Sequence, residues 1–142
     1  MNALSFLKTD HKEINQLLQQ ADSTSNNTEK TREKLFKKIK ERLKIHELIE
    51  EIHFYPQLKE YPETKELILE AYEEHALIDA LVKKLEKEDL TSDEWIAKLT
   101  VLQENIEHHV NEEEEKLFPR VRKILSESIL NEIGASMQKY KS

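Results

Sequence analysis

Residues 46–56 read HELIEEIHFYP, and residues 109–119, which read HVNEEEEKLFP, align with them without a gap. Both stretches begin with a histidine that is followed four residues later by a glutamate, Glu50 in the first and Glu113 in the second. Residues four apart lie one turn apart on the same face of an α-helix. The two stretches therefore predict two helices that each present an imidazole and a carboxylate on one face.

Outward from these stretches, apolar residues recur at spacings of three and four, which is the period of an amphipathic helix. Polar, capping or proline-containing runs break this pattern at residues 23–28, 56–62 and 90–94, where Thr91 and Glu94 form a capping-box pattern. We expect four main helices at roughly 3–22, 29–55, 63–88 and 92–118, and a short amphipathic helix from about Ser126. Pro119 is expected to bend or end the fourth.

Four helices with one apolar stripe each and short connections predict an all-α fold, an antiparallel up-down-up-down four-helix bundle with a short C-terminal helix. The chain of 142 residues fits a single domain that spans residues 1–142. A long two-helix coiled coil is the alternative, but it would not need prolines at positions 56, 62 and 119.

Composition excludes several classes of protein. One glycine and no cysteine argue against a β-sandwich, a disulfide scaffold, a zinc ribbon and a thiol enzyme. A net charge of -7 argues against a nucleic-acid or anionic-membrane partner. No stretch approaches the ~20 apolar residues that span a bilayer, and no basic leader precedes an apolar run, so we expect a cytoplasmic protein. We expect a monomer or a small homo-oligomer.

Each apolar stripe contains a histidine at a core position: His11, His46, His75 and His109. In an antiparallel bundle all four lie roughly 12–20 Å from the same end, at ~1.5 Å of rise per residue. A buried carboxylate without a partner costs on the order of several kcal/mol, so Glu50 and Glu113 in the same layer need an explanation. Four imidazoles and two carboxylates are a plausible ligand set for two metal ions.

The chain resembles the hemerythrin-like, or HHE cation-binding, family across nearly its whole length. The resemblance is carried by Asp10-His11, His46-x-x-x-Glu50-Glu51 with Phe54-Tyr55-Pro56, Glu74-His75, and His109-x-x-x-Glu113-Glu114 with Leu117-Phe118-Pro119. It implies a four-helix bundle with a non-heme di-iron centre of two iron ions (Fe²⁺/Fe³⁺), which binds oxygen or senses iron and oxygen. O₂ or another small diatomic molecule would be the ligand.

Carried over residue by residue, the resemblance implies that the terminal nitrogen ligands are His11, His46, His75 and His109. It implies that the bridging carboxylates are Glu50 and Glu113. Glu47 stands where some iron-sensing relatives have an additional terminal carboxylate, and it is a further candidate ligand. Where oxygen carriers have a second histidine four residues after the one matching His75, this chain has Asp79. In those carriers the last carboxylate lies five residues after its histidine, so Glu114 is an alternative to Glu113. These departures argue against reversible oxygen carriage.

Other interpretations stay open. Manganese or zinc could replace iron in a site of imidazoles and carboxylates. A ferritin-like di-iron oxidase or peroxidase would use Glu-x-x-His pairs and more carboxylates, whereas this chain has His-x-x-x-Glu, so a binding or sensing protein ranks above an enzyme. A metal-free structural bundle would leave the buried carboxylates unexplained. We expect His53 and His108 to lie outside the site.

Overall fold

The computed structural model describes residues 1–142, and every regular element in it is helical. The elements are α1 (Ala3–Asp22), α2 (Glu29–His53), α3 (Tyr55–Leu58), α4 (Pro62–Glu86), α5 (Asp93–Glu112), the π-helix η1 (Glu113–Leu117), α6 (Phe118–Ile124) and α7 (Glu127–Lys141). The all-α class predicted from the apolar stripes is confirmed. No helix is both long enough and apolar enough to cross a membrane.

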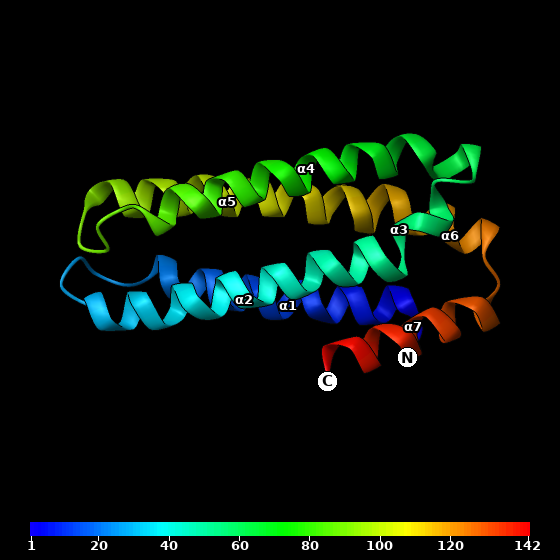
Figure 1. Cartoon of the computed structure of the whole chain (residues 1–142), viewed down its shortest axis with the longest axis horizontal. Coiled ribbons are helices and arrows are strands. Elements are labelled where there is room, and N and C mark those ends of the chain that lie inside the picture. The colour runs from blue at the N-terminus through cyan, green and yellow to red at the C-terminus, as the bar shows by residue number, and fades with distance from the viewer.

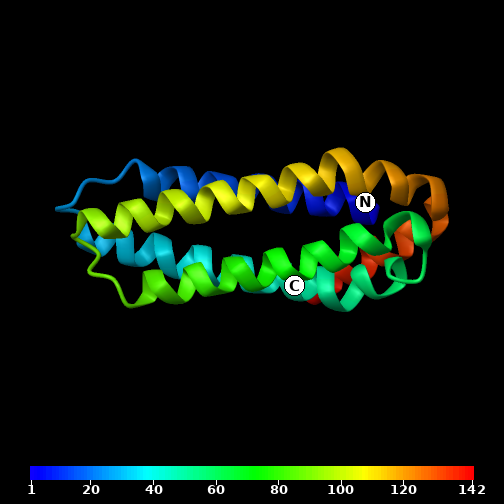
Figure 2. The same cartoon turned by 90° about the horizontal axis from the view of Figure 1, so that it is seen from above.

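The four long helices form two layers, with α1 beside α2 and α4 beside α5, and consecutive long helices run in opposite directions (Figure 1). The α1–α2 and α4–α5 loops lie together at one end of the bundle, and α3 and α6 lie at the other (Figure 2). Helix α7 folds back from that second end and packs along the outside of α1 and α2 (Figure 1). The bundle therefore has a fifth substantial helix on one flank.

Short polar side chains start three of these helices. Asn2 accepts a hydrogen bond from the Ser5 backbone at 2.9 Å, and Ser126 accepts one from the Ile129 backbone at 3.2 Å. These oxygens bind backbone N–H groups that the first turn of a helix leaves free. At α5 the capping residue is Ser92, not Thr91, because Thr91 instead hydrogen bonds to Asp89.

Three predicted boundaries differ from the structure. Helix α2 ends at His53, and residues 55–58 form the separate turn α3. The fourth helix, expected to reach residue 118 and to bend or end at Pro119, ends as α5 at Glu112, and the helical segment continues through η1 and α6 to Ile124. Proline lacks the N–H that would bond to the preceding turn, and a wider π turn accommodates that loss. The last helix is not short: α7 runs for 15 residues.

Two apolar clusters fill the bundle. One contains Leu4, Leu7, Phe54 and Phe118 and extends to Met137 of α7, whereas the other contains Leu18, Ile39, Leu85, Trp95 and Leu99 near the loop end. Along α1, buried His11 falls between the last α1 residue of the first cluster, Leu7, and the first of the second, Ile14. The apolar core is therefore interrupted by one buried polar layer.

Candidate metal centre

Four buried imidazoles make up most of this polar layer. His11, His46, His75 and His109 come from α1, α2, α4 and α5, respectively, and each is almost fully inaccessible to solvent. The Nε2 atoms of His75 and His109 lie 3.2 Å apart, and the ring centroids of His11 and His46 lie 4.9 Å apart. The structure thus brings together the four histidines that the stripes placed at one depth.

Two carboxylates lie among these rings. Glu50 Oε1 lies 3.3 Å from Nε2 of His46, 3.1 Å from Nε2 of His75 and 3.7 Å from Nε2 of His109. Glu113 uses both oxygens: Oε1 lies 3.2 Å from His11 Nε2, and Oε2 lies 3.4 Å from His109 Nε2. Both carboxylates are therefore at the centre of the layer.

The donor atoms fall into two overlapping groups, each with its atoms within 4.8 Å of one another. One group contains His11, His46, Glu50 and Glu113, and the other contains Glu50, His75 and His109. Because Glu50 belongs to both, it lies between two neighbouring positions for a cation. Imidazole nitrogens and carboxylate oxygens are ligands that suit iron, manganese or zinc.

Several buried atoms of this layer make no aligned hydrogen bond, although His11 Nε2 lies 3.2 Å from Glu113 Oε1 and His46 Nε2 lies 3.3 Å from Glu50 Oε1. They are His11 Nε2, His46 Nε2, Glu50 Oε2 and Glu113 Oε1, all buried. A buried polar atom left unpaired costs about 1–3 kcal/mol, and native proteins contain few of them. Four such atoms facing one another fit a centre whose partners are metal ions.

The outward nitrogens are all paired with carboxylates. Each Nδ1 bonds to an acid on an adjacent helix, at 2.6 Å for His46–Asp10, 2.7 Å for His75–Glu51, 2.6 Å for His109–Glu74 and 2.7 Å for His11–Glu114. These bonds form a ring that passes from α1 to α2, α4 and α5, and returns from η1, which continues α5, to α1. An acid on Nδ1 fixes the orientation of an imidazole and leaves Nε2 free for a metal. Glu114 is therefore placed outside the centre and Glu113 inside it.

Charges within the layer balance one another. Burial alone lowers the pKa of the His46 imidazole, but the charge of Glu50 and the hydrogen bond to Asp10 outweigh it and raise the pKa to about 10. Burial raises the pKa of Glu50, yet the charge of His46 and the neighbouring hydrogen bonds bring it well below its usual range. Without a metal, protons on the histidines hold this layer together, so a metal ion has to displace them.

Tyr55 extends the site from the short helix α3. Its hydroxyl donates a short hydrogen bond to Glu113 Oε2 and lies 3.5 Å from Nε2 of both His75 and His109. Burial, followed by the charges of Glu113 and Glu50, raises the pKa of Tyr55 well above its usual value. The hydroxyl therefore keeps its proton and holds Glu113 in place.

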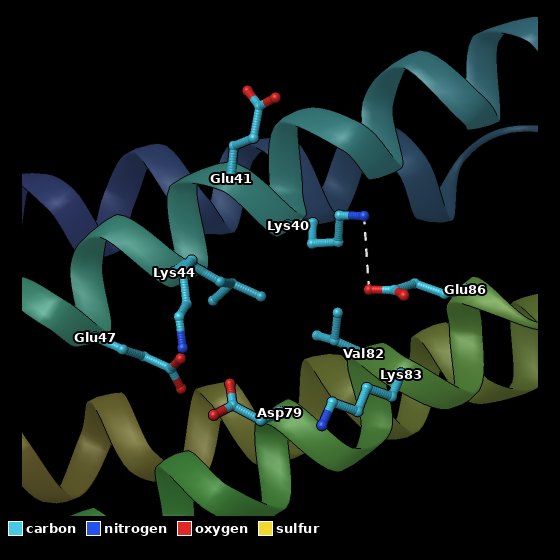
Figure 3. Close-up of a pocket in the computed structure, with 9 residues that line it drawn as sticks. Lys40, Glu41, Lys44, Glu47, Asp79, Val82, Lys83 and Glu86 are labelled. Carbon is cyan, nitrogen blue, oxygen red and sulfur yellow. Dashed lines mark ion pairs between the residues drawn. The ribbon is translucent and has the colours of Figure 1, made fainter.

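Glu47 lies outside both donor groups. It is only 3% exposed and points toward Asp79 of α4 (Figure 3). Burial, followed by the neighbouring Asp79 carboxyl group, raises the pKa of Glu47 to about 8. Glu47 and Asp79 line a groove of about 450 Å³ between α2 and α4, together with lysines such as Lys44 (Figure 3). Neither acid reaches the histidine nitrogens in this structure.

A much smaller cavity lies on the inner side of Glu47. Its volume is about 20 Å³, and its walls include the four core histidines and the apolar side chains of Ile14, Leu43, Ile78 and Ile106. That is enough space for one water-sized molecule. Glu47 and Leu43 line both this cavity and the outer groove, so they form the wall between them.

Two further histidines stay apart from the centre, as expected. The His53 ring contacts the Tyr140 ring, and His108 is exposed beside Glu74. Sequence reasoning missed Asp10 and Glu74 as partners of histidines. The sequence does contain a signal for them, because each of these acids directly precedes a core histidine. In the structure each acid pairs with the core histidine of the next long helix and not with its neighbour in sequence.

Residues 2–121 match a family model described as "Hemerythrin HHE cation binding domain". The chain is a member of this hemerythrin family. An uncharacterised hemerythrin-like protein of Schizosaccharomyces pombe is 30% identical over 98 residues, which are 68% of this chain and 48% of the relative. The chain thus spans about half the length of that curated relative.

A crystal structure of an HHE cation-binding domain-containing protein from Mycobacterium kansasii superposes with a TM-score of 0.85 and is 26% identical. The match covers 99% of this chain and 88% of the other, so the hemerythrin-like fold extends through α7 as well. The resemblance stated from the sequence is confirmed, and the buried histidine and glutamate groups agree with a cation-binding family.

Proposed function

We propose that this protein binds two iron ions in the bundle core and uses them to bind or sense oxygen, iron or both. The observation that carries the proposal is the set of four buried, inward-facing atoms that make no aligned hydrogen bond. Two cations would provide partners for all of them. The family and the two donor groups that share Glu50 support this interpretation.

The proposed ligands are those expected from the sequence. His11 and His46 would bind one iron, His75 and His109 the other, and Glu50 and Glu113 would lie between them. Glu47 is a further candidate, which has to turn away from Asp79 to reach the centre. Manganese or zinc suits the same donors but lacks the oxygen chemistry of iron.

The surroundings favour a small guest. A bound iron pair would supply the redox chemistry, and the chain supplies a dry apolar wall, the Tyr55 hydroxyl on Glu113 and a cavity of about 20 Å³. O₂ or another diatomic molecule fits such a space, whereas a larger substrate does not. Because Asp79 replaces a possible third nitrogen ligand and faces Glu47, we propose a sensor or scavenger of oxygen rather than a reversible carrier.

The test is metal analysis of protein purified without chelators, combined with its visible spectrum. We expect about two irons per chain and the absorption bands of a coupled ferric pair. One zinc per chain, or no metal after anaerobic addition of Fe²⁺, would overturn the proposal. Repeated cycles of oxygenation and deoxygenation of the reduced protein distinguish a sensor or scavenger from a carrier. Several full cycles without accumulation of oxidised iron would favour a carrier.

A further inference from the structure

The last turn of α7 reaches the ring of carboxylates around the site. Lys141 Nζ donates hydrogen bonds to Asp10 Oδ1 at 2.6 Å and to Glu13 Oε2 at 2.9 Å. The other oxygen of Asp10 is the one bonded to His46 Nδ1. A chain of two hydrogen bonds therefore joins α7 to a core histidine. Helix α7 lies beyond the residues 2–121 that the family model matches.

Asp10 differs from the other three acids of the ring. Its side chain is 3% exposed, whereas those of Glu51, Glu74 and Glu114 are 35%, 22% and 32% exposed. Water can solvate these three carboxylates, but Asp10 depends on protein cations for its second oxygen. Lys141 supplies the direct contact, because the nearest atom of Arg42 lies 3.8 Å away.

The fit of α7 makes this contact conditional on docking. A Cβ on Gly134 would lie 2.3 Å from the Met1 carbonyl oxygen, so the helix touches the backbone at the start of α1. Met137 is fully buried one turn before Lys141. Such close packing leaves one position for α7. Lys141 reaches Asp10 only when the helix occupies that position through its last turn.

We infer that Lys141 is a positioning residue for His46 and that docking of α7 is coupled to metal binding at that corner of the site. The inference rests on the proposed metal centre. Coupling between two sites is reciprocal, so a helix that raises metal affinity is itself held more tightly when metal is bound. Metal binding at the centre would then change how tightly α7 is held on the surface of the bundle.

The test compares Lys141→Met with Lys139→Met, whose lysine is exposed on the same helix. Methionine keeps an aliphatic stem near the Phe6 ring but removes the charge that bonds to Asp10. Metal affinity is measured by competition with a chelator, using anaerobic Fe²⁺ and, as an air-stable probe, Zn²⁺. Amide hydrogen exchange of α7 is followed in the metal-free and the metal-loaded protein.

We expect metal to slow exchange in α7 of the wild type and of Lys139→Met. In Lys141→Met this protection should disappear, and affinity for the ion at the His11–His46 position should fall about 10–100-fold, the usual effect of losing a partner behind a ligand. Arg42→Met should do less, given its distance. Unchanged metal affinity in Lys141→Met would overturn this inference but not the proposed function. So would amide exchange in α7 of the wild type that is the same with and without metal. A wild type that binds no metal overturns both proposals.

Discussion

Each acid of the outer ring stands next to a core residue in the sequence, and one step along an α-helix turns a side chain by about 100°. Glu50 and Glu113 therefore point into the bundle, while Glu51 and Glu114 point sideways to histidines on adjacent helices. The same logic applies to Asp10 and His11. A pair of neighbouring polar residues thus supplies one inner donor and one outer support.

Three glutamates of this region should differ sharply when changed to glutamine. Glu50→Gln removes the carboxylate shared by both donor groups and should abolish binding of at least one ion. Glu51→Gln should weaken binding about 10–100-fold, because Glu51 supports His75 from outside. Glu115→Gln is the control, since Glu115 is exposed and belongs to neither donor group. Metal content after gel filtration measures all three, and equal values would contradict the assignment.

At the scale of the element, the sequence predicted the long helices well because each carries a regular apolar stripe. It could not predict η1, since the run Glu112–Glu115 offers four similar residues and no local signal for a wider turn. In the structure the Phe118 N–H bonds to the Glu113 carbonyl, five residues back. The extent of α7 was missed because its packing partners on α1 and α2 lie more than 70 residues away in sequence.

Gly134→Ala tests the seating of α7. On an exposed helix this change stabilises, because alanine has the higher helix propensity. Here the added methyl group would meet the backbone of Met1 and Asn2 at 2.3 and 2.8 Å, so we expect the free energy of unfolding to fall by about 1–3 kcal/mol. Urea denaturation measures it, with exposed Ser136→Ala as the control. A more stable Gly134→Ala protein would show that α7 is not seated as described.

For the whole molecule, the buried layer divides the apolar core into two clusters and makes stability depend on what neutralises it. Without metal, protonated histidines do so: the pKa of His46 is raised to about 10, so its contribution is complete below its unfolded pKa of ~6.5 and lost as pH rises through 10. With metal, the imidazoles must be neutral. Acid therefore favours the metal-free protein, and neutral or higher pH favours the metal-bound one.

The melting temperatures of metal-loaded and metal-free protein should converge in acid. Near pH 8 the loaded protein should melt well above the free one, because ligand binding stabilises the native state. The difference should shrink as the pH falls below about 10, the raised pKa of the His46 imidazole, and vanish in acid, as protons displace the metal. Calorimetry across this range measures it. A gap as large at pH 4 as at pH 7 would mean that the histidines are not ligands.

The π turn η1 also predicts what the deletion of one residue in this segment would do to stability and to metal binding. The Glu113 carbonyl accepts from the N–H of Phe118 five residues on, whereas in a regular α-helix it would accept from the residue four on. A π turn is the equivalent of one residue added to an α-helix, and such turns are common at functional sites. Deleting exposed Glu115 should join α5 and α6 into one continuous helix, with Leu117 and Phe118 still facing the core. We expect this shortened protein to melt no lower than the metal-free wild type while retaining less metal, so selection for stability alone would not keep the extra residue.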